Sequence, residues 1–218
     1  MKGQRARNQK DKSKRREKLL HSAMKQFCKL GYEKTTIGDI TKYAGLSTGT
    51  FYIYYQSKIE IFKTLLNIGI DGLRRELMDA VKKSIKQTRG NALRELSLAY
   101  CNYYKKNPEY YQIIVMVTLQ DNDLRERGSR ISKLIDKKTL RVLRLVKNNI
   151  QDGIKTREFR KVNPWTTAYT FWATLDGVLT LQTRNNLKVV GIELNELISK
   201  SIDTLLLGIQ NVQKTSRK

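Results

Sequence analysis

The sequence is poor in the residues that most often build metal centres, disulfides and catalytic sites. It contains one histidine and two cysteines among 218 residues. Cys28 and Cys101 lie far apart, without the paired spacing of a zinc site or a disulfide framework, so we expect both to be small core residues in a reducing compartment. As the only histidine, His21 is expected to be a plain surface residue. We therefore expect no metal site and no cofactor.

Catalytic motifs and long apolar runs are also missing. We find no nucleophile elbow, phosphate-binding loop or pair of neighbouring carboxylates, and we do not expect an enzyme. No apolar run approaches the roughly 18 residues needed to span a bilayer. The basic segment Met1 to Arg16 leads into no signal-peptide core. These features predict a cytoplasmic protein with no membrane partner.

Acidic residues are scarce as well. The 20 Asp and Glu residues are outnumbered by 43 Lys and Arg residues, which gives a formal net charge of +23. Such an excess favours a polyanionic partner, either nucleic acid or an anionic membrane surface. With 39% hydrophobic residues, the chain can still bury a sizeable core in one or two domains.

The positive charge is concentrated at the start of the chain. Residues 1–18 carry nine basic residues against Asp11 and Glu17, and they have almost no apolar side chains. This composition predicts a flexible basic arm over residues 1–16. Such an arm either lies along a phosphate backbone, enters a minor groove or remains a solvated tail.

The next segment has the pattern of short helices joined by tight turns. Apolar residues from Leu19 to Phe27 fall at helical spacing, and Gly31 is expected to end that helix. Thr36 and Asp39 have the spacing of a capping box for a second helix, which Gly45 would end in the left-handed conformation. The second and third helices then form a helix-turn-helix, whose second member occupies a DNA major groove.

The third helix has one apolar side and one polar side. Ser47 is its expected N-cap, and on a helical wheel Phe51 and Tyr55 point to the core. Glycine at 49 costs about 1 kcal/mol relative to alanine, which close approach to DNA would offset. Tyrosine hydroxyls on this side suit phosphate oxygens, and Ile53 suits a thymine methyl group. The predicted contact residues from Thr48 onward are Thr48, Gly49, Thr50, Tyr52, Ile53, Tyr54 and Lys58.

The run GYEKTTIGDITKYAGLSTGTFYIYYQSKIEIF resembles the DNA-binding domain of the TetR (tetracycline repressor-like) family of transcriptional regulators. Departures from the family pattern at Thr41, Leu46, Tyr55 and Phe62 remove no contact position. The resemblance implies a helix-turn-helix domain over residues 17–65. It also implies phosphate or base contacts from Thr36, Ser47, Thr48, Gly49, Thr50, Tyr52, Tyr54 and Lys58.

Residues 66–218 have helical patterns throughout, and the resemblance implies that they hold an effector pocket and a dimer interface. Two concentrations of aromatic residues are either core or pocket lining for an effector of unknown identity. The tentative effector-binding residues are Tyr100, Tyr103, Tyr104, Tyr111, Trp165, Tyr169, Trp172 and Asp176. Asp176 either pairs with a basic side chain or meets a cationic effector. The positive charge of this region makes an anionic acyl-coenzyme A the alternative.

The last two predicted helices, about 164–184 and 194–212, have more apolar surface than one neighbour can cover. The tentative dimer-interface residues are Phe171, Leu175, Val178, Leu179, Ile198, Ile202, Leu205 and Ile209. Gly177 and Gly208 would allow close approach of helices there.

These patterns predict an all-α homodimeric transcriptional repressor. It would bind a palindromic operator in double-stranded DNA and be released by a small-molecule effector. The alternative is a ligand-independent architectural or division-control protein of the same fold.

Overall fold

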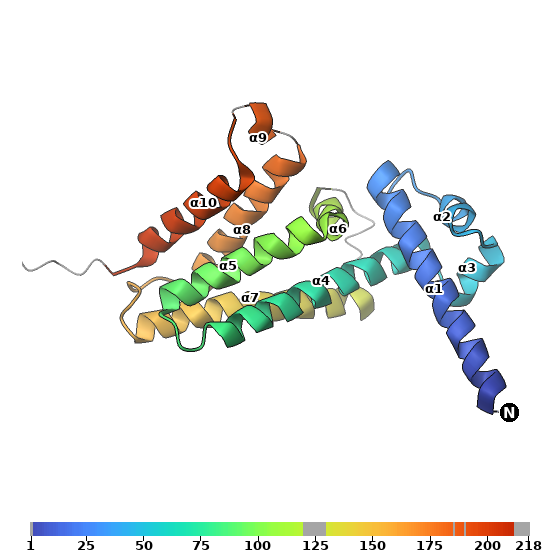
Figure 1. Cartoon of the computed structure of the whole chain (residues 1–218), viewed down its shortest axis with the longest axis horizontal. Coiled ribbons are helices and arrows are strands. Elements are labelled where there is room, and N and C mark those ends of the chain that lie inside the picture. The colour runs from blue at the N-terminus through green and yellow to red at the C-terminus, as the bar shows by residue number, and fades with distance from the viewer. Residues whose placement is uncertain (1, 120–129, 185, 190, 212–218) are drawn as a thin grey trace, which may run out of the picture. The chain divides into compact units, whose positions relative to one another are not determined.

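The computed structural model describes residues 2–119, 130–184, 186–189 and 191–211 (Figure 1). Over these residues the regular structure is helical, apart from one isolated antiparallel bridge between Phe159 and Gln210. The all-α prediction is therefore confirmed. No helix in the described ranges is long and apolar enough to cross a membrane. The helices are α1 (Lys2–Leu30), α2 (Ile37–Ala44), α3 (Thr48–Tyr54), α4 (Lys58–Lys83), α5 (Arg89–Lys106), α6 (Pro108–Leu119), α7 (Arg130–Lys155), α8 (Pro164–Thr183), α9 (Asn186–Val189) and α10 (Leu194–Ile209).

The helices divide into two compact units. Unit 1 comprises Met1–Asp71 and Asn107–Lys137, and unit 2 comprises Gly72–Lys106 and Lys138–Lys218. The predicted domain boundary at residue 65 falls six residues before the end of the first segment of unit 1, and α6 was expected in the other domain. The reason for the difference is tertiary packing, since α6 returns to pack against α1.

The first helix corrects a prediction. It begins at Lys2, so residues 2–16 are helical where a flexible arm was expected. Lysine, arginine, glutamine and alanine are good helix formers, and this stretch contains no proline. The hydroxyl of Ser13 also donates to Glu17 Oε1 one turn later, at 3.0 Å. A composition with almost no apolar residues therefore predicted the exposure of residues 9–16 correctly but did not exclude the helix.

The core of unit 1 is a cluster of aromatic and aliphatic side chains from α1, α2, α3 and α4. Phe27 packs against Phe62 at a ring-centroid distance of 5.3 Å, and Tyr32 packs against Phe62 at 5.0 Å. Leu19, Phe27 and Phe51 are all fully buried. Gly31 has φ +80° directly after Leu30, which confirms that it ends α1.

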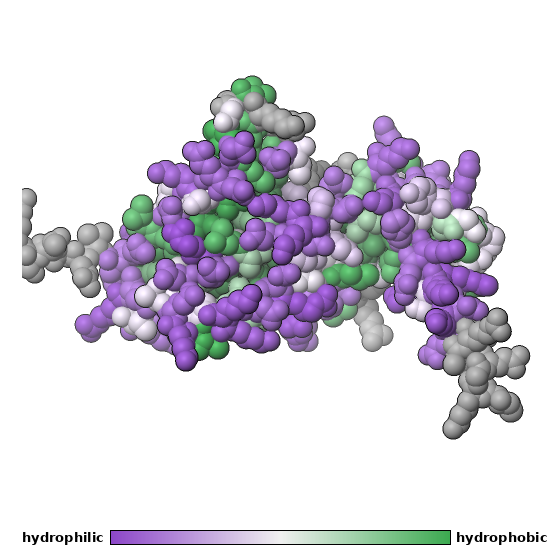
Figure 2. Space-filling view, in the orientation of Figure 1, coloured by the Kyte–Doolittle hydropathy of each residue, from purple (hydrophilic) through white to green (hydrophobic). Residues whose placement is uncertain are grey.

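Unit 2 is built from α5, α8 and α10, which pack on one another. Pro164 is the first residue of α8, and the side chain of Asn163 caps the helix by accepting from the N–H groups of Trp165 and Thr166, each at 3.0 Å. An ion pair between Arg94 and Asp203 joins α5 to α10. Hydrophilic side chains cover most of the visible surface (Figure 2).

Candidate nucleic-acid interface

The helix-turn-helix begins with a complete capping box at α2. The N–H of Asp39 donates to Thr36 Oγ1 at 3.1 Å. In return Asp39 Oδ2 accepts from the Thr36 hydroxyl at 2.6 Å and from the Thr36 N–H at 2.9 Å. These hydrogen bonds from Thr36 lower the pKa of Asp39. The predicted cap is confirmed, and Thr36 is held on the surface at the helix N-terminus.

The turn between α2 and α3 depends on Gly45. Its φ of 64° and ψ of 38° lie in the left-handed region. Its N–H donates to Lys42 O at 3.2 Å, and the N–H of Leu46 donates to Thr41 O at 3.0 Å. This is the hydrogen-bond pattern of a Schellman motif, which ends α2 and fixes the direction in which the chain enters α3. The predicted role of Gly45 is confirmed.

The third helix is capped and oriented by local contacts. Ser47 Oγ accepts from the N–H of Thr50 at 3.2 Å and lies 2.9 Å from Thr50 Oγ1. Phe51 is fully buried and Tyr55 is 3% exposed, so both rings hold α3 on the core as predicted. Burial raises the pKa of the Tyr55 phenol, and the nearby Arg16 guanidinium opposes that rise.

The opposite face of α3 is open to solvent. Ile53 is 71% exposed and Tyr52 is 56% exposed, although both are large side chains. Thr48 and Gly49 are exposed, whereas Thr50 and Tyr54 are half-buried. The structure therefore brings these six residues, predicted to contact DNA, onto one short helix.

Neither the space around Gly49 nor its backbone conformation requires a glycine at this position. Among the described residues, a Cβ built at this position would meet only Ser47 Oγ, at 3.8 Å, which is ordinary van der Waals contact. The helical backbone at this position is also open to any L-residue. The space in front of Gly49 is free for a partner to approach the first turn of α3 closely.

Lys58 has a structural role that the sequence pattern did not reveal. Its Nζ donates to Tyr32 O at 2.9 Å and to Glu33 O at 3.2 Å, and it lies 4.3 Å from the centre of the Tyr32 ring. The ammonium group therefore ties the N-terminus of α4 to the loop that follows α1. A phosphate contact from Lys58 stays a prediction, and it would have to share this ammonium group.

In unit 2 the structure brings together three of the predicted effector-binding residues. The hydroxyl of Tyr100 donates to Asp176 Oδ1 at 3.1 Å and accepts from Trp172 Nε1 at 3.2 Å. Tyr104 packs on both Tyr100 and Tyr103, at centroid distances of 5.1 and 5.0 Å. Asp176 thus accepts from a tyrosine on α5, where the sequence left its partner open.

The other predicted effector residues lie in different surroundings. Trp165 and Tyr169 contact each other on α8 at a centroid distance of 6.5 Å, and Tyr169 is 44% exposed. Tyr111 is buried on α6, which belongs to unit 1. Tyr103 is packed so closely against α4 that a Cβ at Gly72 would clash with its hydroxyl oxygen.

Most of the predicted dimer-interface residues are core residues of unit 2. Seven of them are less than 9% exposed within the single chain, and Leu205 alone is half-buried. Those seven are Phe171, Leu175, Val178, Leu179, Ile198, Ile202 and Ile209. The prediction that they form an outer surface is therefore wrong, because the contacts among α5, α8 and α10 already cover them.

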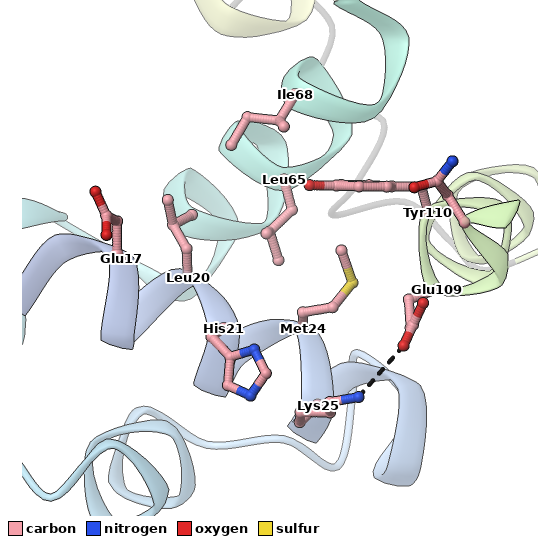
Figure 3. A pocket seen from close by; sticks show the side chains of 10 residues that line it. Glu17, Leu20, His21, Met24, Lys25, Leu65, Ile68, Glu109 and Tyr110 are labelled. Carbon is pink, nitrogen blue, oxygen red and sulfur yellow. Dashed lines mark hydrogen bonds and ion pairs between the residues drawn. The ribbon is translucent and has the colours of Figure 1, made fainter. Parts of the chain in front are cut away.

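The structure also contains a cavity that the sequence did not indicate, because its walls come from three helices far apart in the chain. It has a volume of about 330 Å³ and lies between α1, α4 and α6 of unit 1 (Figure 3). Leu20, Met24 and Leu65 give it an apolar wall, and the ion pair between Lys25 and Glu109, at 3.3 Å, lies at its edge. His21 is exposed, as predicted, and lines the cavity. Among the described residues no three His, Cys, Asp or Glu side chains are grouped to hold a metal ion.

Comparisons with known proteins agree with this arrangement. Residues 19–65 match the family model described as bacterial regulatory proteins, tetR family. The HTH-type transcriptional regulator YfiR of Bacillus subtilis strain 168 is 30% identical over 170 residues, which cover 77% of this chain and 80% of that protein.

Two solved structures show the same fold over nearly the whole chain. FadR from Bacillus subtilis in complex with stearoyl-CoA has a TM-score of 0.71 at 19% identity, covering 88% of this chain and 98% of that one. AibR in complex with isovaleryl coenzyme A and operator DNA has a TM-score of 0.71 at 14% identity, with the same coverage of both chains. Identities this low establish the fold, whereas the family follows from YfiR and from the match over the helix-turn-helix. The chain belongs to the TetR family of transcriptional regulators.

Proposed function

We propose that this protein is a homodimeric repressor that binds a palindromic operator through α3 of each copy and leaves it when a small-molecule effector binds. The single observation that carries the DNA-binding part is the exposed face of α3. Ile53 and Tyr52 have large side chains that are mostly exposed to solvent. Gly49 has no side chain to cover the first turn of α3. A face of this kind fits a major groove, which is about 12 Å wide and admits one helix.

The residues on this face divide by chemistry. Tyr52 and Tyr54 present hydroxyl groups on rigid rings, which suit phosphate oxygens and fix the position of the helix. Thr50 and Ile53 suit base edges, with the isoleucine against a thymine methyl group. The Thr36 hydroxyl donates to Asp39 Oδ2 in the free chain, and it would have to turn from that carboxylate to donate to a phosphate at the N-terminus of α2.

We place the dimer interface on the exposed faces of α8 and α10. Tyr169 and Leu181 are 44% and 38% exposed on α8, and Leu207 is 71% exposed on α10. A Cβ at Gly177 or at Gly208 would meet no atom of the described part of the chain within 4 Å, so both helices can be approached closely along these faces. Two copies related by a two-fold axis would then present two α3 helices to the two halves of a palindrome.

We place the effector in unit 2 and assign it to the acyl-coenzyme A class. Asn149 is 9% exposed, and its Oδ1 has no hydrogen-bond donor among the described residues. A buried acceptor without a partner costs about 1–3 kcal/mol, which a ligand N–H would recover. The amide groups of a pantetheine arm carry such donors. The complexes of FadR and AibR with acyl-coenzyme A compounds, on the same fold, support this class.

Selection of binding sites from a random duplex library tests the DNA-binding part. The expected result is a two-fold symmetric motif whose half-sites are spaced by about one helical turn, 10–10.5 base pairs, or a multiple of it. A motif without two-fold symmetry would contradict the homodimer.

The effector is tested on the selected duplex with a series of acyl-coenzyme A compounds of increasing chain length. Fluorescence anisotropy should show operator affinity weakened about 5- to 150-fold by the best member. Operator binding that no member of the series changes would contradict this effector class. It would also favour the ligand-independent architectural or division-control alternative.

A further inference from the structure

The first helix extends well beyond the core that it helps to form. Residues 9–18 are all exposed, and Leu19 follows as a fully buried residue. We call residues 9–18 the basic extension. At 1.5 Å per residue it is about 15 Å long. Figure 1 shows α1 running past α2 and α3 toward the N-terminus.

The chemistry of the basic extension favours one class of partner. It contains no apolar residue, so it lacks the apolar face with which an interfacial helix enters a lipid surface. Asp11 and Glu17 offset only part of its positive charge. Its basic residues are Lys10, Lys12, Lys14, Arg15, Arg16 and Lys18.

The basic extension starts beside the end of the helix that reads DNA. Figure 1 shows α1 running past α3 on its way to the N-terminus, and Tyr55, the residue that ends α3, has the Arg16 guanidinium among the groups that act on its pKa. The rest of the basic extension therefore continues past the C-terminal end of α3. A duplex that holds α3 in its major groove has a groove wall within about 6 Å of the axis of that helix, because the groove is about 12 Å wide.

We propose that the basic extension is a second DNA-binding element, which lies against the sugar-phosphate backbone beside the groove that α3 reads. A helix with its side chains is about 10–12 Å across, and a minor groove is only about 6 Å wide. The helix is therefore too wide to enter the minor groove as an extended arm could. The part of the DNA that it can reach is the sugar-phosphate backbone. This inference rests on the proposed function, because it requires α3 to be in the groove.

One face of the basic extension is better placed for this contact than the other. Lys12 and Arg15 precede Leu19 by seven and four residues, so they lie on the same side of α1 as this fully buried residue. Lys10 and Lys14 lie on the opposite side, in line with the exposed His21. The first pair should contact phosphates, and the second pair should remain in solvent.

The test compares two double variants with the same loss of charge on the same helix. In one, Lys12→Gln and Arg15→Gln remove the facing pair. In the control, Lys10→Gln and Lys14→Gln remove the opposite pair. Affinity for the selected operator is measured by fluorescence anisotropy between 50 and 200 mM salt, and circular dichroism checks that both variants keep their helix content.

A plot of log affinity against log salt has a negative slope, and each phosphate contact contributes about 0.9 to its magnitude. The facing variant loses two contacts, so its slope should be less steep by about 2. Its affinity at 100 mM salt should fall by about tenfold, with unchanged base preference in the selection. The control should keep the wild-type slope. Equal slopes for both variants would overturn the proposal, as would binding of the unchanged chain to phosphatidylserine vesicles that only the facing variant loses. Failure of the unchanged chain to bind any duplex would instead overturn the proposed function.

Discussion

α3 and α8 both mix aromatic, aliphatic and small residues, yet their faces were predictable to very different degrees. On α3 the wheel separated Phe51, which is fully buried, from Ile53, which is 71% exposed. On α8 the residues predicted to face a second copy of the chain are in the core of unit 2, and the exposed apolar residues include Tyr169 and Leu181. The sequence therefore assigned the correct side in one helix and the wrong side in the other.

The difference follows from how each helix is bounded and covered. α3 has seven residues, a local cap at its start and one apolar side, so only one phase of the wheel buries its rings. α8 has 20 residues and is apolar on most of its circumference, so periodicity does not say which side meets the rest of the same chain. For a helix that is apolar on all sides, the exposed face can be identified only from the tertiary structure.

The largest expected effect concerns the buried side of α3. Phe51→Ala should lower the free energy of unfolding by about 3–5 kcal/mol, because the ring is fully buried and leaves a cavity. Ile53→Ala, two residues away, should change it by less than about 0.5 kcal/mol while weakening operator binding. Urea unfolding followed by circular dichroism measures both. Similar losses of stability in the two variants would contradict the assignment of sides.

The matching pair on α8 tests the corrected assignment there. Leu175→Ala should cost about 2–5 kcal/mol of stability, since Leu175 is 3% exposed within the chain. Gly177→Leu should gain up to about 1 kcal/mol of helix propensity in the monomer and dissociate the dimer, because its open side would be filled. Light scattering and urea unfolding separate the two outcomes. A Gly177→Leu variant that stays dimeric would place the interface elsewhere.

A smaller effect distinguishes the two kinds of DNA contact on α3. Tyr54→Phe should weaken binding to all sequences by about 1 kcal/mol, or roughly fivefold, if its hydroxyl holds a phosphate. Thr50→Ala should chiefly relax base preference, although it also removes a hydroxyl that lies 2.9 Å from Ser47 Oγ. Binding-site selection with both variants is the measurement. Identical base preferences for the two would refute the division.

The smallest expected effect is the pH dependence that Glu109 gives to unit 1. A backbone hydrogen bond and then the hydrogen bond from Lys25 lower the pKa of Glu109 in the folded chain. A carboxyl group with a lowered pKa stabilises the fold above its unfolded pKa, and this contribution is lost as pH falls through the folded value. Glu109→Gln should therefore flatten the stability profile below about pH 5, by less than 1 kcal/mol because the pair is partly exposed. An unchanged profile would show that the pair does not couple to folding.

Features set by neighbours in sequence were predicted, and features set by distant contacts were not. The capping box of Thr36, the left-handed Gly45 and the cap at Ser47 each depend on residues within five positions along the chain. The anchoring of Lys58 to Tyr32 O spans 26 residues, and no local pattern indicates it.

The same distinction explains why the two compact units differ from the predicted domains and why the first helix begins at Lys2. α6 joins unit 1 through contacts with α1, including the pair Lys25 and Glu109, which are 84 residues apart. Local composition predicts solvent exposure for residues 2–16, which holds for residues 9–16, but the flexible arm that it also predicts is replaced by a helix. Helix formation there needs only propensity and continuity with a packed helix.

The central claim is that the exposed face of α3 is the surface that meets DNA. Amide-resolved NMR of the labelled protein with its selected operator tests this most directly. We expect the largest chemical-shift changes and protection from exchange at residues 47–54, with smaller changes at Thr36. Saturable binding of the operator with unchanged amides over residues 47–54, and changes confined to another surface, would contradict the account.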